Sequence, residues 1–255
     1  MFFKTQDSLP DGVGFSTFDS THLIWLAVGL TAIILAAVFY RRFTLKRKRI
    51  VLCILGGYIF FQEMLKNVVV AAVGEFSYGY LPFHLCGINI LLIAFDIIKP
   101  TAVVRTFLYY FCIPGAALAL ILPNWTETPF FNFFHLHSFT IHILLIMYPV
   151  LLIAAGQVKP NFKSALKSLL LLVALAIPVY FLNLWWGTNF MFLMHPDKGN
   201  PLEMFEKLLG SHLWGFPILL PIVMLIMYIP LGIIYRNKKQ TEQISETEEK
   251  ETVTV

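Results

Sequence analysis

The chain has 255 residues, of which 58% are hydrophobic and only 13% are charged, and its mean hydropathy is +0.73. A soluble domain is nearer half apolar and its apolar residues are broken up by charges, so this composition excludes an ordinary soluble protein and indicates a membrane protein. The formal net charge of +4 does not indicate nucleic-acid binding, because the basic residues gather between long apolar runs. We therefore expect membrane lipids, and no nucleic acid, as partners.

Residues 1–19 are polar and mildly acidic, and we expect them to form an extracytoplasmic segment. Seven apolar runs follow, each close to the ~20 residues that a helix needs to cross the hydrocarbon of a bilayer. They cover residues 21–40, 50–73, 80–98, 102–122, 139–155, 166–186 and 213–235. Runs this long and unbroken exclude barrel strands. The sequence predicts an all-α, polytopic bundle of about seven transmembrane helices over residues 20–236, followed by a disordered polar tail at 237–255.

The lysines and arginines alternate between the two sides of this bundle. The loop after the first run holds six basic residues between positions 41 and 49, and the later loops and tail on the same side hold Lys99, Arg105, Lys159, Lys163, Lys167, Arg236, Lys238 and Lys239. The opposite side holds only Lys4, Lys198 and Lys207. The positive-inside rule therefore places the N-terminus outside and the C-terminus in the cytoplasm, as expected for a multi-pass protein of the cell membrane.

Two features on the outer side and within the runs modify this picture. The outer loops at residues 123–134 and 187–212 are rich in aromatic residues, which favour the headgroup level of a membrane. Prolines within the runs, among them Pro114, Pro149 and Pro178, predict kinks that neighbouring helices accommodate.

Polar side chains inside the runs fall mainly in the outer half of the membrane when depth is counted at about 1.5 Å per residue. Polar groups in a bilayer are costly, so each is a functional hypothesis. Their common depth predicts a polar cavity that opens toward the outer leaflet. The expected cavity residues are His22, Glu63, Lys66, Asn67, His84, Asn89, His142, Asn183 and Asn189.

The helical spacing leaves alternatives open for the charged pair. Glu63 lies three residues before Lys66 and four before Asn67, so the three side chains share one helix face. The ion pair then either tunes a site or fixes the packing of the helices.

Cys86 is a candidate nucleophile, although a free cysteine is more usually a small buried apolar residue. His84 and Cys86 point about 200° apart on a regular helix, so they do not form a nucleophile–base pair. A base would come from another helix, where His137 and His142 have a suitable depth. His142 is alternatively an interhelical hydrogen-bonding residue, and His135 and His137 are alternatively interfacial.

Three motifs in order carry a resemblance to a known family: LPFHLC at 81–86, FFNFFHLHSFTIH at 130–142 and WWGTNFMFLMHP at 185–196. Together with His22 they resemble the bacterial YwaF family of integral membrane proteins, which is grouped with the eukaryotic transmembrane protein 164 acyltransferases. The resemblance implies a seven-helix membrane protein that transfers acyl chains between phospholipids through a cysteine intermediate. It implies Cys86 as that nucleophile, because Cys86 ends the HLC motif. It also implies His137 as a family-type histidine, to which we assign the role of base as a hypothesis.

The leading interpretation is therefore a membrane-embedded acyltransferase that acts on lipid esters, with a phospholipid as substrate. The competing interpretation is a non-enzymatic polytopic protein, either a transporter or a small-ligand or lipid binder, that uses Glu63, Lys66, His84 and Asn89. An odd number of helices and no evident inverted repeat argue weakly against a transporter. No HExxH, HxxxH or CxxC spacing is present, so we expect no metal and no cofactor.

Overall fold

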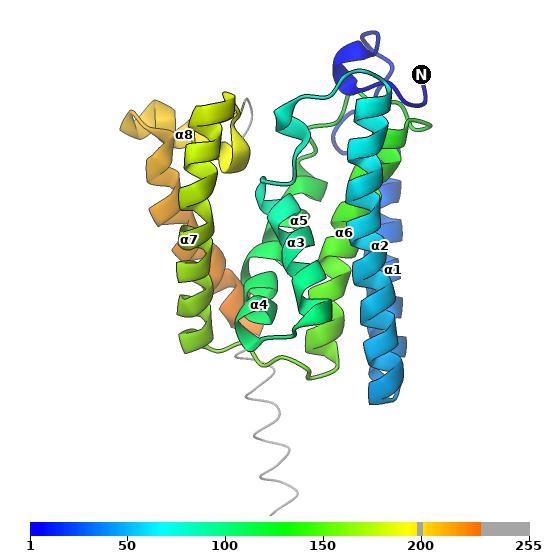
Figure 1. Cartoon of the computed structure of the whole chain (residues 1–255), viewed down its shortest axis with the longest axis vertical. Helices are drawn as coiled ribbons and strands as arrows, with labels where there is room; N and C mark the ends of the chain where they lie inside the picture. Colours follow the sequence, from blue (N-terminus) through cyan, green and yellow to red (C-terminus); the bar gives the residue numbers. More distant parts are fainter. Residues whose placement is uncertain (198–200, 231–255) are drawn as a thin grey trace, which may run out of the picture.

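The structure is a computed structural model, and it describes residues 1–197 and 201–230. All regular structure in these ranges is helical, which confirms the prediction of an all-α polytopic bundle (Figure 1). The predicted tail at 237–255 and the end of the last predicted run lie outside the described residues. The helices are α1 Ser20–Arg41, α2 Leu45–Ala72, α3 Leu85–Ile98, α4 Ala102–Phe107, α5 Ile113–Ile121, α6 Phe133–Ala154, α7 Phe162–Trp186, α8 Pro201–Leu209 and a C-terminal span His212–Pro230.

Six of these segments are long and apolar enough to cross a membrane, and α3 is a shorter apolar helix. The crossing segments are α1, α2, α6, α7, the C-terminal span, and the continuous stretch Ala102–Ile121 that contains α4 and α5. In Figure 1, α1, α2 and α6 stand together on one side, α3, α4 and α5 lie in the centre, and α7 and α8 lie on the other side. Helix α6 packs against α1, α2, α3 and α5, and α4 packs against α7.

Helix α3 is shorter than the predicted run at 80–98. It begins only at Leu85, after a 3₁₀ turn at Tyr78–Tyr80 and an extended residue at His84. Pro82 accounts for the late start, since proline lacks an N–H and restrains the residue before it. The Pro82 backbone also lies only 2.5 Å from where a Cβ on Gly87 would be, so the chain folds back closely onto the first turn of α3. At 14 residues, α3 covers about 21 Å and does not cross the bilayer alone.

The stretch Ala102–Ile121 contains a π-helical turn, Leu108–Cys112, between α4 and α5. Pro114 explains this turn, because proline cannot donate to the carbonyl four residues earlier and its ring clashes there. The predicted kink at Pro114 is thus taken up as a π turn, in which the helix widens locally. All five residues of the turn are buried.

Helix α6 starts at Phe133, six residues before the predicted run at 139–155. The aromatic-rich stretch before it was expected to be a loop, but Asn132 caps the helix by accepting hydrogen bonds from the N–H groups of Phe134 and His135 at 2.8 and 3.3 Å. His135 and His137 therefore belong to the first two turns of α6. The N-terminal segment lies over this helix start, where Phe133 N–H donates to the Phe2 carbonyl at 2.8 Å.

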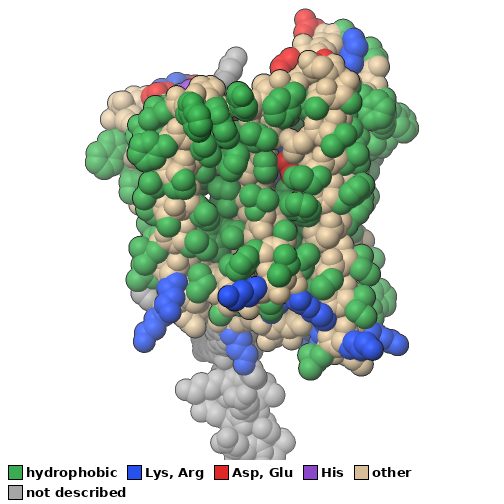
Figure 2. Space-filling view, in the orientation of Figure 1, with side chains coloured by type: hydrophobic (Ala, Val, Ile, Leu, Met, Phe, Trp, Pro, Cys, Tyr) green, Lys and Arg blue, Asp and Glu red, His purple; other side chains and the backbone are tan. Residues whose placement is uncertain are grey.

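The surface agrees with a membrane protein of this orientation. Hydrophobic side chains cover the flanks of the molecule, whereas Lys and Arg side chains gather at the lower end, opposite the N-terminus (Figure 2). We call this lower end, where α1 ends and α2, α4 and α7 begin, the basic end. The positive-inside rule predicts that the basic end faces the cytoplasm.

Candidate functional site

The charged pair of α2 is buried within the bundle. Lys66 Nζ donates to Glu63 Oε1 at 2.6 Å and to the Tyr80 carbonyl at 2.9 Å. Asn67 donates through Nδ2 to the Glu63 carbonyl at 2.9 Å and lies 3.4 Å from Glu63 Oε1. The pair thus does two things at once: it neutralises a carboxylate that is only 4% exposed, and it ties α2 to the turn that leads into α3.

The start of α3, at Leu85, lies at the level of this ion pair. Farther down α2, Gly56 faces Ile93 and Ile97 of α3, and the two helices run antiparallel. Two turns along α2, this register brings Glu63 opposite the start of α3. The Glu63 carboxylate is close enough to Cys86 to act electrostatically on its thiol. Cys86 packs against the central apolar core rather than pointing only to lipid.

Helix α6 brings His137 to the same place. The ring lies beside the Gln62 backbone, next to Glu63, and the charge of Lys66 acts on it. The side chain is 7% exposed, and its Nε2 atom has no hydrogen-bond partner. No hydrogen bond joins the Cys86 thiol to a histidine in the part of the chain that the structure describes.

Within the described residues, several buried polar atoms of α2, α3 and α6 lack a hydrogen-bond partner. They are Asn67 Oδ1, both amide atoms of Asn89, and His137 Nε2. Asn89 is fully buried and follows Cys86 by three residues, so the two side chains lie on one face of α3. More than nine in ten buried polar groups are paired in folded proteins, so such a group of unpaired atoms calls for an explanation. We call Glu63, Lys66, Asn67, Cys86, Asn89 and His137 the α2–α3–α6 cluster.

The amino-terminal end of α3 adds further free donors to the cluster. His84 is its N-cap residue, and its side chain makes no capping hydrogen bond. The first N–H groups of a helix have no partner within the helix. The backbone around Cys86, the second residue of α3, is therefore suited to an oxygen that carries negative charge.

Two other predicted residues make hydrogen bonds that hold the fold together. His22 accepts from the Phe18 N–H at 2.8 Å through Nδ1, and its Nε2 bonds the Leu120 carbonyl at 2.7 Å. His142 bonds the Ser138 carbonyl of its own helix through Nδ1 at 2.7 Å and stacks on Trp125. His22 therefore fastens α1 to α5, and both its ring nitrogens are occupied.

The remaining predicted residues surround the outer mouth of the bundle. Asn183 holds the turn after α7, where it bonds the N–H and the carbonyl of Phe190 at 2.8 and 3.0 Å. Asn189 accepts from the N–H groups of Met194 and His195 at 3.1 and 3.2 Å. His84 and Asn189 both line a pocket of about 600 Å³ between this turn and the loop before α3.

The backbone that follows the pocket-lining residue Phe190 has an unusual conformation beside His84. Met191 and Phe192 both have positive φ angles, of 57° and 55°, and the Met191 N–H donates to His84 Nδ1 at 3.3 Å. Non-glycine residues in this region are uncommon and are held there by their surroundings. The histidine of the LPFHLC motif thus meets the WWGTNFMFLMHP motif directly.

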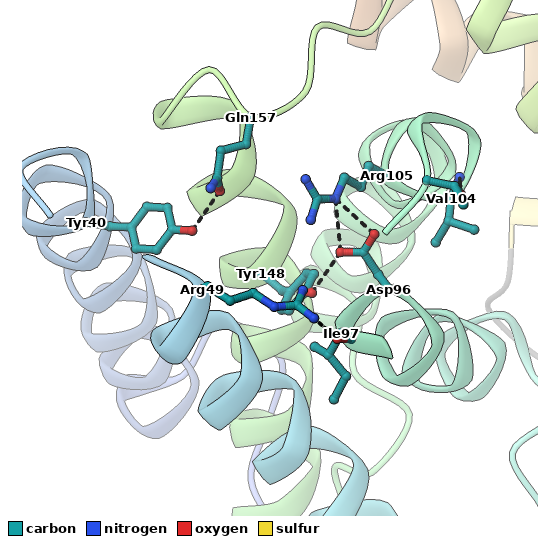
Figure 3. A network of polar contacts seen from close by, with 9 residues as sticks. Tyr40, Arg49, Asp96, Ile97, Val104, Arg105, Tyr148 and Gln157 are labelled. Carbon is teal, nitrogen blue, oxygen red and sulfur yellow. Dashed lines mark hydrogen bonds and ion pairs between the residues drawn. The ribbon is translucent and has the colours of Figure 1, made fainter. Parts of the chain in front are cut away.

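Sequence reasoning missed two polar groupings. Asp96, Arg105 and Tyr148 form a buried network at the basic end, shown in Figure 3; an aspartate in an apolar run was the available signal. His135, for which the sequence leaves an interfacial position open, is fully buried, accepts from Trp25 Nε1 at 3.0 Å and bonds the Thr128 carbonyl at 3.1 Å. Within the described residues, no three His, Cys, Asp or Glu side chains are grouped so as to hold a metal ion.

Comparison with known proteins connects these features to a family. The model of the TMEM164 family matches residues 17–231, which is most of the chain. The chain belongs to the TMEM164 family. No curated protein and no solved structure gives a significant match. Membership of this family, together with the six apolar helices long enough to cross a bilayer, shows that the chain is a multi-pass membrane protein.

The matched range contains every residue of the α2–α3–α6 cluster and both walls of the pocket at the outer mouth. It also contains all three motifs on which the resemblance rests. The N-terminal residues that lie over the start of α6 fall almost entirely before the matched range.

Proposed function

We propose that this TMEM164-family protein is an enzyme of the YwaF-like bacterial branch that resides in the cell membrane. It transfers an acyl chain from a phospholipid to the free hydroxyl of a lysophospholipid through a thioester on Cys86. The observation that carries the proposal is the set of buried polar atoms without a partner in the described residues, on the helix of this cysteine and on the two helices packed against it: Asn89 Nδ2 and Oδ1 on α3, Asn67 Oδ1 on α2, and His137 Nε2 on α6. They offer donors and acceptors to a lipid ester at a point where the protein itself uses none of them.

The first half-reaction would form the thioester. His137 takes the proton of the Cys86 thiol, and the sulfur attacks the carbonyl carbon of the donor ester. The tetrahedral intermediate carries its negative charge on the former carbonyl oxygen. When the carbon–oxygen bond breaks, the departing lysophospholipid oxygen takes the proton from His137. The acyl chain remains on sulfur.

The second half-reaction reverses these roles. The hydroxyl of an acceptor lysophospholipid gives its proton to His137 and attacks the thioester carbonyl. The carbon–sulfur bond breaks, and the Cys86 sulfur recovers the proton. No oxidant, reductant or cofactor enters either step, and the acceptor becomes a new phospholipid.

Two parts of α3 suit the charged intermediate. The N–H groups of the first turn, which the N-cap side chain of His84 does not bond, belong to Cys86 and its neighbours, and the Asn89 amide lies one turn further on the same face. Preorganised donors of this kind stabilise a developing oxyanion, and removing one typically lowers kcat by about 100- to 1,000-fold. We therefore assign Asn89 as an oxyanion donor and the Glu63–Lys66 pair as the support that positions α2 beside it.

Transfer between lipids tests the proposal. Purified protein in liposomes would receive a phospholipid with a labelled acyl chain and an unlabelled lysophospholipid, and labelled product would be measured over time. We expect Cys86→Ser and His137→Gln to lose transfer, and His142→Gln, which changes the other histidine at this depth, to retain most of it. Full transfer by Cys86→Ser would exclude the mechanism.

The competing function is lipid or small-ligand binding without chemistry, and the buried Glu63–Lys66 pair favours it as much as catalysis. The two functions differ in what happens to the labelled lipid. A binder would retain intact phospholipid in the wild type and in Cys86→Ser alike, with no labelled product. Product that depends on Cys86 would rule binding out as the whole function.

A further inference from the structure

A second polar network lies at the basic end of the bundle, far along α3 from Cys86. Arg105 Nε donates to both oxygens of Asp96, at 2.9 and 3.1 Å, and the Tyr148 hydroxyl donates to Asp96 Oδ2 at 3.0 Å. Asp96 is fully buried, and both hydrogen bonds to its carboxylate from the guanidinium come from Nε. In Figure 3 the two terminal nitrogens of Arg105 extend away from Asp96, to the side on which Gln157 lies, with no bond drawn to either.

A pocket of about 240 Å³ opens beside this guanidinium. It lies at the basic end, between the loop before α4 and the loop that joins α6 to α7. Helices α4 and α7 both begin there. Its lining includes two cationic side chains and no acidic one. The polar lining residues are Thr101, Arg105, Thr106, Gln157, Lys159, Asn161 and Ser164.

Gln157 adds a neutral donor to the two cations. The Tyr40 hydroxyl donates to Gln157 Oε1 at 2.7 Å, so the amide oxygen is occupied and the amide nitrogen is left to face elsewhere (Figure 3). The Tyr40 side chain is 1% exposed, so packing holds its ring in place and its hydroxyl keeps a defined position beside Gln157. The pocket is therefore lined by a guanidinium, an ammonium and a carboxamide side chain, and each of these groups carries N–H donors.

We propose that this pocket binds a phosphate group. The two terminal nitrogens of Arg105 make no hydrogen bond within the described residues, and such a guanidinium matches the oxygens of a phosphate, while Lys159 adds a second positive charge. Asp96 holds Arg105 in place but does not line the pocket, so its negative charge lies behind the guanidinium rather than in the path of an anion. The site is separate from the Cys86 chemistry and does not depend on it.

The position of the pocket points to two sources for this phosphate. Basic residues at the cytoplasmic face attract anionic lipids, so the headgroup of an inner-leaflet phospholipid is one source. A soluble phosphate in the cytoplasm is the other. Both share the same recognition chemistry, and a lipid differs in that its glycerol and acyl chains must reach the bilayer beside α4 and α7.

Thermal unfolding of the full chain in a maltoside micelle, free of phosphate, tests the site. Inorganic phosphate and dihexanoyl-phosphatidylglycerol would be titrated separately, and an apparent Kd taken from the rise in Tm. Lys159→Gln should weaken that Kd about tenfold, because it removes a charged hydrogen-bonding partner. Lys46→Gln makes the same charge change at an exposed position of the basic end, outside the pocket, and should leave Kd unchanged.

The two ligands distinguish the sources. Stabilisation by both indicates that the phosphate group suffices, and stabilisation by the lipid alone indicates a headgroup site. Gln157→Glu, which places an acid in the pocket, should abolish binding of either ligand while Tm without ligand shows whether the fold is retained. No stabilisation of the wild type by either ligand, or an equal Kd in Lys159→Gln and wild type, would overturn the proposal.

Discussion

Single asparagines of this protein differ sharply in whether their polar atoms have partners. Asn183 binds the N–H and carbonyl of Phe190 and the Thr188 hydroxyl, whereas Asn89 is fully buried with both amide atoms unpaired. A polar group buried without a partner costs free energy, and an apolar side chain of similar size removes that cost. The two positions should therefore respond in opposite ways to the same substitution.

We expect Asn89→Leu to leave the free energy of unfolding unchanged or to raise it by up to about 2 kcal/mol, while transfer activity falls. Asn183→Leu should lower the free energy of unfolding by about 2–3 kcal/mol, because it leaves the Phe190 backbone groups without partners. Denaturant unfolding in mixed micelles measures both. Equal destabilisation by the two substitutions would mean that Asn89 has a structural partner rather than a substrate.

Glu75, in the outer loop after α2, is a residue whose charge state links the N-terminal segment to the bundle. Hydrogen bonds from the Ser8 hydroxyl, and then from the Thr5 hydroxyl, hold the pKa of its carboxyl below the usual range. A carboxyl with a lowered folded-state pKa stabilises the fold fully above its unfolded pKa, about 4.3. That contribution is lost as the pH falls through the lower, folded value.

We therefore expect a carboxyl NMR titration of Glu75 to give a lower pKa in the wild type than in Ser8→Ala/Thr5→Val. The Tm of the wild type should also fall more steeply below pH 4.5 than that of Glu75→Gln, since the variant lacks the titrating group. Coincident titration curves for the wild type and the double variant would show that the two hydroxyls do not contact the carboxylate in solution.

Between elements, the contact of α2 with α3 and α6 depends on one glycine. A Cβ on Gly56 would lie 2.9 Å from Ile97 Cγ2 and 3.1 Å from Ile93 Cγ2, whereas a Cβ on its neighbour Gly57 would meet nothing within 4 Å. The β-branched isoleucines cannot turn away easily, because their χ1 angles are restricted. Close packing at Gly56 sets the distance at which α2 meets α3.

The two adjacent glycines form a matched pair for this packing. Gly56→Ala should lower the free energy of unfolding by about 1–3 kcal/mol through overpacking. Gly57→Ala should raise it by about 0.5–1 kcal/mol, because alanine favours the helix over glycine. Unfolding in mixed micelles measures both, and a loss of the same size at Gly57 would refute the assignment of the interface to Gly56.

The long helices could be predicted from hydropathy, because crossing a bilayer demands a long apolar segment whatever its neighbours are. The starts of α3 and α6 could not. Pro82 and a close approach at Gly87 delay α3, and a cap by Asn132 advances α6 into a stretch whose aromatic composition suggested a loop. The prediction for α6 followed the aromatic composition of the stretch and gave no weight to Asn132. In the fold, the cap that Asn132 provides sets the start of the helix.

The candidate site was predictable in depth but not in pairing. Counting residues along each run brought Glu63, Cys86 and His137 to one level, and the structure places His137 beside α2 and Glu63 near the thiol. Which polar atoms lack partners depends on the rotation of each helix about its axis. His22 and Asn183 show this most clearly, since their depth matched the cavity but their atoms are occupied by the backbone.

Taken whole, the molecule has one basic end (Figure 2) and an opposite end that carries the N-terminal segment (Figure 1). If the basic end faces the cytoplasm, Lys207 of α8 and Lys46 of α2 lie on opposite sides of the membrane. A membrane-impermeant amine reagent applied to right-side-out vesicles should modify Lys207 at once and Lys46 only after permeabilisation. Mass spectrometry of the peptides reports both sites, and the reverse order would invert the topology.

The covalent role of Cys86 is tested most directly by intact-protein mass spectrometry after incubation with phospholipid and no acceptor. We predict one added acyl mass that hydroxylamine removes, present in the wild type and in the control variant Cys53→Ala of α2, and absent from Cys86→Ala. Cys112, whose thiol donates to the Leu145 carbonyl, should carry no acyl group. No adduct on the wild type, or an adduct of equal yield on Cys86→Ala, would contradict the cysteine mechanism.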